Sequence, residues 1–396
     1  MRQVQMQAAL AALALVACSG SAPAADNQGG GQSGGSVTAS SGKPFSTRVV
    51  ADFETPWAMS FLPGSGVPMT KMALVTEKSG KLWLVDVASG QKQAVSGVPA
   101  VKVAGQGGLG DVVAHPGFAG NQRVYLSFAE AGPGEASGAA LGYGTLKLGQ
   151  GAPRIEGFKI IWRQAPKVTG NGHFAHRIAF APDGTIFLSS GERQKFDPAQ
   201  AHDANLGKIL HLTAEGQPVS GGPFADRGGV APQIYSMGQR NNLGLAFAPD
   251  GRLWATEMGP KGGDELNLIE AGKNYGYPIV SNGSHYDGRD IPDHDTRPEF
   301  AAPKLWWDPS ISPAGLIIYS GDLFKDWKGD AIFGALSGQA LVRADLDGAN
   351  ARKADHWSMG ARIREVEQGP DGEIYLLEDG DDGSAGRLIR LDPARG

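Results

Sequence analysis

The sequence predicts an all-β fold: a six-bladed β-propeller with four-stranded blades, preceded by a signal peptide and a disordered tether. Three observations predict it. The 396 residues include 59 Gly and 25 Pro with few long helical apolar periods, which indicates many short strands joined by tight turns. Three segments of the body resemble one another, and their spacing suits six repeats. The N-terminal region has the composition of an export signal followed by a linker.

Residues 1–17 are predicted to be a lipoprotein-type signal peptide, because Arg2 is followed by an apolar run and then small residues. The run is shorter than the about 20 apolar residues that a spanning helix needs. It ends in LVAC (15–18), which resembles a bacterial lipobox and makes Cys18 the candidate for lipidation. Ser19 fits sorting to the outer membrane. The alternative is a signal peptide cut nearby, with Cys18 incidental.

Residues 18–42 are rich in Gly and Ser and contain almost nothing to bury, so they are predicted to form a flexible tether. We therefore expect an exported protein, lipid-anchored to the periplasmic side of the outer membrane through Cys18, or free in the periplasm. Since Cys18 is the only cysteine, no intramolecular disulfide is possible. The formal net charge of −5 shows no basic excess, which argues against nucleic acid as a partner.

Residues 43–396 are predicted to form the propeller. Three segments, FAPDGTIFLSSGE (180–192), FAPDGRLWATEMG (247–259) and QGPDGEIYLLEDG (368–380), each have Pro-Asp-Gly, an apolar strand and a polar loop. Asp-Gly suits a tight turn between strands. The segments lie one and then two units of about 60 residues apart, and six such units fill the body. Blades of the shorter WD40 type, roughly 40–45 residues, would instead give seven or eight.

Polar residues follow several strand-like segments, and in a propeller such positions meet on one face around the central channel. One loop, ATEMGPKGGDELN (255–267), crowds Glu257, Asp264 and Glu265 around a Gly-Pro turn. It is either a solvated turn or a site for a hard cation. The other polar positions are Gln106, Asp111, His173, His176, Arg177, Arg240, Asn241, Arg362 and Arg364.

In combination, the segments GQGGL, RNNLGLAFAPDG, WATEMGPKGGDELN, NYGYP and GALSGQALVRADLDG resemble the soluble pyrroloquinoline-quinone (PQQ)-dependent sugar dehydrogenases. The resemblance is greatest to the aldose sugar dehydrogenase branch, the glucose/sorbosone dehydrogenases, and it covers nearly the whole body. It implies a six-bladed propeller with PQQ and Ca²⁺ in the central face. It also implies oxidation of an aldose at C1 to the lactone, with electrons passed to an external acceptor.

The resemblance also implies roles for individual residues. His173 corresponds to the general base, a task that suits an imidazole. Gln106 corresponds to a residue beside the substrate and the base, and Trp307, or else Trp306, is the candidate aromatic residue of the sugar site. Contacts to PQQ are implied for Arg240, which also belongs to the catalytic set, and for Asn241, Arg362 and Arg364. Alternate positions on a strand would place the last two arginines on one face, and guanidinium groups suit a tricarboxylate.

For the metal, the resemblance implies that Gly259 and Pro260 ligate Ca²⁺ through their carbonyls, and that Asp264 and Tyr275 lie around a second calcium ion. Backbone carbonyls are ordinary Ca²⁺ ligands. Glu257 and Glu265 are interpreted as structural residues or as supports of the site.

The chain also departs from the family pattern. Ser337 stands where glucose-type members have a lysine, Gly172 where some relatives have Asp, and His176 where relatives have a small residue. Two other functions remain open. One is a Ca²⁺-dependent six-bladed lactonase, which would need carboxylate and Asn ligands at the channel. The other is a propeller without a cofactor that binds a glycan or a protein.

Overall fold

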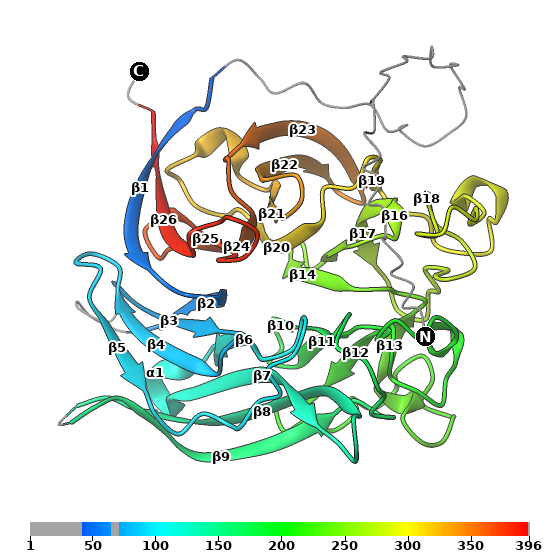
Figure 1. Ribbon diagram of the computed structural model, residues 1–396, viewed down its shortest axis with the longest axis horizontal. Helices are drawn as coiled ribbons and strands as arrows, with labels where there is room; N and C mark the ends of the chain where they lie inside the picture. The colour runs from blue at the N-terminus through cyan, green and yellow to red at the C-terminus, as the bar shows by residue number, and fades with distance from the viewer. Residues whose placement is uncertain (1–41, 65–70, 150, 395–396) are drawn as a thin grey trace, which may run out of the picture. The chain divides into compact units, whose positions relative to one another are not determined.

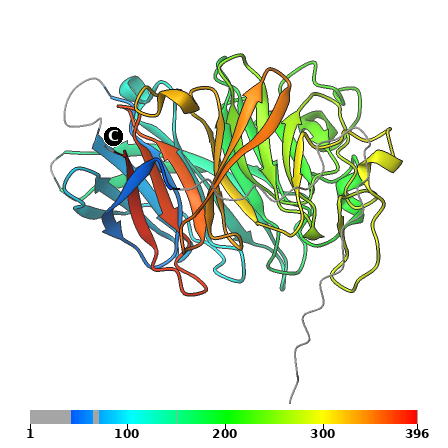
Figure 2. The same cartoon turned by 90° about the horizontal axis from the view of Figure 1, so that it is seen from above.

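The computed structural model describes residues 42–64, 71–149 and 151–394, in which six four-stranded antiparallel sheets are arranged in a ring (Figure 1). The predicted six-bladed propeller is therefore confirmed. Turned by 90°, the sheets are seen side by side with their strands upright (Figure 2). The predicted signal peptide, Cys18 and nearly all of the predicted tether lie outside the described residues. Among the described residues, no helix is long and apolar enough to cross a membrane.

The first three blades are each built from four consecutive strands. Blade 1 contains β2 (Pro56–Phe61), β3 (Met72–Glu77), β4 (Lys81–Asp86) and β5 (Lys92–Val95). Blade 2 contains β6 (Leu109–Ala114), β7 (Arg123–Ala131), β8 (Ser137–Lys147) and β9 (Arg154–Arg163), with the short helix α1 (Phe118–Asn121) between its first two strands. Blade 3 contains β10 (Ala175–Phe180), β11 (Ile186–Ser190), β12 (Lys208–Leu212) and β13 (Ile234–Met237).

Blades 4 and 5 follow the same plan. Blade 4 contains β14 (Asn242–Phe247), β15 (Leu253–Glu257), β17 (Asp264–Ile269) and β19 (Leu305–Trp307), and blade 5 contains β20 (Pro313–Ile318), β21 (Ala331–Ala335), β22 (Ala340–Asp347) and β23 (Asn350–Ser358). A two-stranded sheet, β16 (Lys261–Gly262) with β18 (Gly283–Ser284), projects from blade 4. Short 3₁₀ turns occur at η2 (Asp197–Gln200), η3 (Ala231–Gln233), η4 (His294–Thr296) and η5 (Lys325–Trp327).

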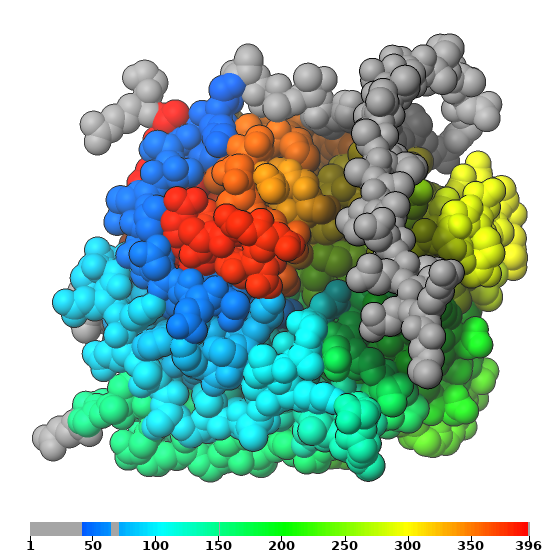
Figure 3. Space-filling model, viewed as in Figure 1, coloured from blue at the N-terminus to red at the C-terminus, as the bar shows by residue number. Residues whose placement is uncertain are grey.

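Blade 6 is shared between the two ends of the described chain. It contains β24 (Ile363–Gln368), β25 (Ile374–Glu378) and β26 (Arg387–Pro393), and its outermost strand is β1 (Phe45–Asp52), which pairs antiparallel with β26. In the space-filling view the blue N-terminal strand lies beside the red C-terminal segment (Figure 3). This pairing closes the ring and leaves β24 next to β2 of blade 1.

The six innermost strands, β2, β6, β10, β14, β20 and β24, surround the central channel. Each of them pairs with its neighbour through a register shift close to its first residue. Such a bulge bends the strand and redirects a side chain. Four residues at these bulges, Trp57, His176, Leu243 and Arg364, line the cavity described below.

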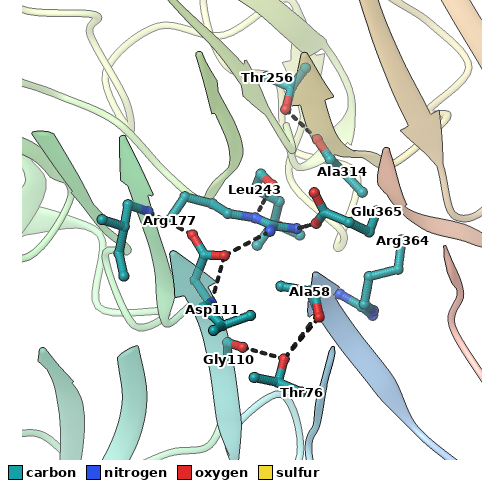
Figure 4. Close-up of polar contacts among 12 residues, drawn as sticks. Ala58, Thr76, Gly110, Asp111, Arg177, Leu243, Thr256, Ala314, Arg364 and Glu365 are labelled. Carbon is teal, nitrogen blue, oxygen red and sulfur yellow. Dashed lines mark hydrogen bonds and ion pairs between the residues drawn. The ribbon is translucent and has the colours of Figure 1, made fainter. Parts of the chain in front are cut away.

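Hydroxyl groups on the second strands join each of four blades to the next. Oγ1 of Thr76 donates to the carbonyl of Gly110 at 2.6 Å, and Oγ1 of Thr256 donates to the carbonyl of Ala314 at 2.7 Å (Figure 4). Ser127 and Ser189 make the corresponding bonds to the carbonyls of the next inner strands. These bonds hold the bulged strand ends in place, and the apolar cores pack between adjacent sheets.

Candidate active site

A cavity of about 420 Å³ lies at one end of the central channel, where residues from all six blades converge. Its volume falls in the range of about 300–1,000 Å³ that is typical of small-molecule sites. Nine residues that the sequence analysis selected line it: Gln106, His173, His176, Arg240, Asn241, Gly259, Pro260, Arg362 and Arg364. The polar residues therefore gather on one face, as the repeat pattern predicted.

His173 is buried in the cavity wall with a positive φ of 47°. Its Nδ1 is hydrogen-bonded to Oε1 of the fully buried Glu192, and its backbone N–H donates to Oε1 of Gln106 at 2.7 Å. An ionised Glu192 can only accept, so Nδ1 carries the proton and Nε2 keeps its lone pair. Burial lowers the pKa of His173, and the positive charge of Arg240 adds to this, while Glu192 opposes both. The imidazole is therefore neutral and can accept a proton at Nε2.

Glu192 is held by the loop that follows β11. Its Oε2 accepts hydrogen bonds from the backbone N–H groups of Lys195 at 2.5 Å and Phe196 at 2.9 Å. Arg193 holds the segment that precedes His173. Its guanidinium donates to the carbonyls of Gly172 at 2.8 Å and Ser137 at 2.6 Å and lies over the ring of Phe174. These contacts fix the loop that carries His173.

Arg240 and Asn241 both have a polar atom with no partner among the described residues. Arg240 is 4% exposed; its Nη1 donates to the carbonyl of Met258 at 3.0 Å, but its Nε has no acceptor. Oδ1 of Asn241, which is 1% exposed, is likewise unpartnered. Because buried polar groups are nearly always hydrogen-bonded, a pair of orphaned polar atoms on a cavity wall indicates that a polar ligand completes them.

Arg362 and Arg364 share one carboxylate. The Nε atoms of both donate to Asp379, which is 1% exposed, with Arg362 at 2.9 Å. Burial alone would raise the pKa of Asp379, but Arg364 and Arg362 hold it at about 2. A guanidinium has five N–H donors, so Asp379 fixes the two side chains while their remaining donors are available to a ligand.

Lys78 adds a cation from blade 1, the neighbour of the blade that carries Arg362 and Arg364. It lies in the turn after β3, lines the cavity and pairs with Asp381. Ser337, where the resemblance implies a lysine in glucose-type members, hydrogen-bonds to Oγ of Ser312 at 2.7 Å. The cavity wall thus carries four cationic side chains in spite of that departure.

The Gly259–Pro260 turn lines the cavity and is fixed by a hydrogen bond to Asp264. Oδ1 of Asp264 accepts from the N–H of Gly259 at 2.8 Å, and its Oδ2 accepts from the hydroxyl of Ser310 and from two backbone N–H groups. Both carboxylate oxygens are therefore engaged by protein donors. Asp264 therefore fixes this turn, and its expected place around a second calcium ion stays a prediction.

Glu257 and Glu265 form a buried pair beneath the turn. Asn267 donates to both, at 3.4 and 2.8 Å, and Glu257 also accepts from the backbone N–H of Arg240. Burial, followed by repulsion from Glu265, raises the pKa of Glu257, and burial raises that of Glu265. No group of three or more His, Cys, Asp or Glu side chains within the described ranges is arranged to hold a metal ion.

An ion cluster lies next to Trp57 and Leu243 of the cavity wall. Arg177 lies between Asp111, at 3.3 Å, and Glu365, at 2.5 Å, and donates through Nε to the carbonyl of Leu243 at 2.7 Å (Figure 4). Its guanidinium also covers the ring of Trp57 at 4.1 Å. These groups join blades 1, 2, 3, 4 and 6 across the channel, so Asp111 and Arg177 support the site from below.

A second cavity of about 250 Å³ adjoins the first and shares His173, Arg240, Pro260 and Tyr286 with it. Its walls combine aromatic and charged side chains. Tyr286 is 74% exposed and Phe196 is 43% exposed, and Tyr277 lines the same space. Exposed aromatic rings beside a buried base form a surface on which an amphipathic ligand can lie.

The expected aromatic residue of the sugar site does not line either cavity. The ring of Trp307 packs edge-on against Phe333 in the apolar core of blades 4 and 5, and Lys353 covers it. Trp306 is also absent from both cavity walls. The phenol of Tyr275 is turned to the backbone, accepting from the N–H of Glu270 and donating to the carbonyl of Leu268. Tyr275 lines a void of about 10 Å³ together with Gly259 and Pro260.

The sequence analysis missed Glu192, Asp379, Lys78, Trp57 and Tyr286. A signal for the first was present. Buried glutamates end or follow the second strand in four blades, at Glu77, Glu192, Glu257 and Glu378, so an alignment of the internal repeats would have selected this position. Tyr286 lies in a long irregular segment with no repeat counterpart, and nothing in the pattern identified it.

Comparisons with known proteins identify the family and several relatives of this chain. Residues 53–390 match the sequence profile of the Glucose / Sorbosone dehydrogenase family. The chain is 35% identical over 345 residues to the aldose sugar dehydrogenase YliI of Escherichia coli, covering 85% of this chain and 90% of that protein. It is 28% identical over 258 residues to quinoprotein glucose dehydrogenase B of Acinetobacter calcoaceticus, covering 59% of this chain and 52% of that protein.

A solved structure gives the same likeness in three dimensions. The PQQ-bound form of an aldose sugar dehydrogenase from Streptomyces coelicolor superposes with a TM-score of 0.73 and 26% identity, covering 88% of this chain and 98% of that chain.

Proposed function

Because this chain belongs to the glucose/sorbosone dehydrogenase family, we propose that it oxidises aldose sugars at C1 to the lactone, with Ca²⁺ beside its quinone cofactor and an external acceptor for the electrons. The chain is a PQQ-dependent sugar dehydrogenase, an oxidoreductase acting on CH–OH. One observation carries the proposal for the site. A neutral imidazole, held by Glu192, faces the same cavity as four cationic side chains and the unpartnered atoms of Arg240 and Asn241.

PQQ fits this cavity by its chemistry. It is a planar quinone with three carboxylates, and the wall offers the N–H groups of Arg362, Arg364 and Arg240 together with the ammonium of Lys78. Charge-assisted bonds from guanidinium to carboxylate are among the strongest hydrogen bonds in proteins. When bound, PQQ supplies an electrophilic quinone carbonyl that takes up the two electrons and the hydrogen of the sugar C1.

His173 is the residue that moves the proton. With Nδ1 held by Glu192, its Nε2 accepts the proton of the sugar C1 hydroxyl as C1 is oxidised. Gln106 holds the other side of the substrate. Its Oε1 is engaged by the backbone N–H of His173, so its amide N–H₂ remains to donate to a sugar oxygen.

The sugar is proposed to enter over the second cavity, where Tyr286 and Phe196 present exposed rings next to His173. The apolar C–H face of a pyranose packs well on an aromatic ring, while its hydroxyls reach polar groups at the edge. This gives Tyr286 and Phe196 the function that the sequence analysis expected of Trp307.

Calcium binding is proposed at the carbonyls of Gly259 and Pro260, next to Arg240 on the cavity wall. Ca²⁺ accepts backbone carbonyls and waters among its six to eight oxygen ligands, so such a site needs no cluster of side-chain acids. The bound ion would act as a Lewis acid on an oxygen of the cofactor. The hydrogen bond from Gly259 to Asp264 supports the proposal because it fixes the turn.

We also propose export and lipid anchoring at Cys18, on the LVAC segment and the Gly/Ser-rich residues that follow it. The electron acceptor would then be an external carrier or protein, since the sequence contains no C-x-x-C-H haem attachment motif.

Calorimetric titration of the apo-protein with PQQ, with and without Ca²⁺, tests the function. We expect binding that requires Ca²⁺, and aldose oxidation with an artificial electron acceptor that chelation abolishes and Ca²⁺ plus PQQ restores. If the apo-protein binds no PQQ in the presence of Ca²⁺, the dehydrogenase function is wrong. A propeller that binds a glycan or protein without a cofactor would then be the better description.

A further inference from the structure

His176 occupies a place in the cavity wall that only a glycine opposite makes possible. The residue is 1% exposed and lies at the bulge of β10, with a φ of 62°. A Cβ atom built on Gly110 would lie 1.8 Å from Cε1 of the imidazole and 2.4 Å from Nδ1. Any side chain at position 110 therefore excludes the ring, and the two residues form one structural unit.

The hydrogen bonds around Ser127 fix which nitrogen of His176 carries the proton. The hydroxyl of Ser127 lies 2.7 Å from the carbonyl of His176, to which it donates its single proton. The same Oγ accepts from the backbone N–H of Asp111 at 2.9 Å and lies 2.8 Å from Nδ1 of His176. Since its proton is already used, Oγ must also accept from Nδ1, and Nδ1 is protonated.

The other nitrogen is consequently a hydrogen-bond acceptor. Burial, helped by the charge of Arg177, lowers the pKa of His176 to about 3, so the ring is neutral and Nε2 keeps its lone pair. Among the described residues Nε2 has no hydrogen-bond partner, although the ring lines the cavity beside Leu243 and Arg364. Stacking on Trp57, with centroids 5.1 Å apart and planes inclined by 17°, holds the ring in this orientation.

We propose that Nε2 of His176 accepts a hydrogen bond from the pyrrole N–H of bound PQQ and thereby selects the orientation in which the cofactor lies in the cavity. The proposal rests on the proposed function. Lys78, Arg240, Arg362 and Arg364 are donors, which match the carboxylates and the quinone oxygens. The pyrrole N–H is the single donor of the PQQ ring system and needs an acceptor. The amide of Asn241 carries a donor and an acceptor and can turn to suit either, whereas the tautomer of His176 is fixed.

The test compares His176→Phe, which keeps a ring of similar size but removes the acceptor, with His115→Phe. His115 also stacks on an aromatic ring, that of Tyr125, but does not line the cavity. Each apo-protein is titrated with PQQ in Ca²⁺ by calorimetry. We expect His176→Phe to bind PQQ about 5- to 30-fold more weakly, the effect of leaving a buried donor without an acceptor. Because a cofactor that is no longer held in one orientation presents its quinone to His173 less often, the kcat of this variant at saturating PQQ should also fall. His115→Phe should bind PQQ like the wild type.

Nitrogen NMR of the protein labelled with ¹⁵N-histidine provides a second measurement that does not depend on a variant. The His176 resonances should report a proton on Nδ1 in the apo-protein, and PQQ should shift the Nε2 resonance toward the value of a hydrogen-bonded acceptor. An unmoved Nε2 resonance in the PQQ-bound protein overturns the proposal, and so does a folded His176→Phe variant with wild-type affinity. If the variant does not fold, the NMR measurement decides. Failure of the wild type to bind PQQ refutes the proposed function itself, which separates the two outcomes.

Discussion

Glu192 accepts a hydrogen bond from Nδ1 of His173, and both side chains are buried at the base of the cavity. The second oxygen of Glu192 accepts from the backbone of the loop that follows, so the carboxylate cannot turn away from the ring. This contact decides the tautomer and the direction of the imidazole, and it raises the pKa of His173 against the effect of burial.

Replacement of Glu192 by Gln should therefore lower kcat by about 10- to 100-fold, because the amide no longer stabilises the imidazolium that forms when His173 takes up a proton. The pH dependence of kcat/KM shows in which direction the pKa of His173 moves. Burial already lowers the pKa of His173 from its ordinary value of 6.5, and Glu192 opposes it, so its loss lowers that pKa further. The acidic limb of kcat/KM against pH should lie below 6.5 in the wild type and move to lower pH in the variant. If neither the acidic limb of the pH profile nor kcat changes, the proposed action of Glu192 on His173 is wrong. Glu215→Gln, at the surface, is the control.

The two histidines of the HFAHR segment should differ in the kinetic parameter that they control. His173→Ala should retain PQQ binding but lose at least about 10²-fold in turnover, the usual effect of removing a general base. His176→Ala should keep turnover much closer to the wild type, because its ring is neutral and hydrogen-bonded to Ser127. Steady-state kinetics at saturating PQQ separates the two, and a reversed order of effects would refute the assignment of the base.

Arg362→Ala and Arg364→Ala should each weaken PQQ binding by roughly 10- to 100-fold, the loss of one charged hydrogen bond. Each variant also leaves Asp379 with a single guanidinium partner. Calorimetry with PQQ in Ca²⁺ measures the effect. Arg154→Ala, which removes an exposed arginine paired with Glu156, should bind PQQ like the wild type. Equal affinities for all three variants would exclude the arginine pair as the carboxylate site.

Gly110→Ala should destabilise the protein by about 1–3 kcal/mol, the usual cost of overpacking, because the new methyl group meets the ring of His176. His176→Ala should remove most of that cost. Urea unfolding of both single variants and the double variant gives the coupling free energy, expected at about 1–3 kcal/mol in favour of the double variant. Strictly additive effects would mean that the ring moves aside without cost.

Cys18→Ser should abolish incorporation of labelled lipid and release the protein from the membrane fraction, if LVAC (15–18) is a lipobox. Metabolic labelling with a fatty acid, together with fractionation of the wild-type and variant strains, measures both effects. The folded domain of the released variant should keep its activity. Identical labelling and fractionation of the variant would remove the anchoring proposal.

The sequence predicted the parts of the molecule that repeat. Each Pro-Asp-Gly turn precedes the second strand of a blade, β11, β15 or β25, because Asp-Gly specifies a tight turn locally and the strand that follows begins with apolar residues. The alternate arginines 362 and 364 do reach the same cavity. These features depend on neighbouring residues along the chain, so a short stretch of sequence is enough to predict them.

The features that were missed depend on contacts between blades. Trp306 and Trp307 are adjacent on a strand and face opposite sides of the sheet, but the pattern does not say which side another blade covers. Trp307 was covered by Phe333. The role of Asp264 likewise depends on the backbone N–H groups of Ile311 and Ser312, which lie far along the chain. The backbone donors to Glu192 are local, but the sequence does not predict which N–H groups will be free.

Because β1 pairs with β26, the ring can close, and the cofactor site can form, only after the last blade has been synthesised. Of the described strands, β1 is synthesised first and its partner β26 last. A growing chain therefore holds β1 without its partner through almost all of its synthesis. Arg362, Arg364 and Asp379 belong to the same last blade. A chain that stops before blade 6 therefore has neither a closed ring nor a carboxylate site, and it cannot sequester the quinone in a half-made protein.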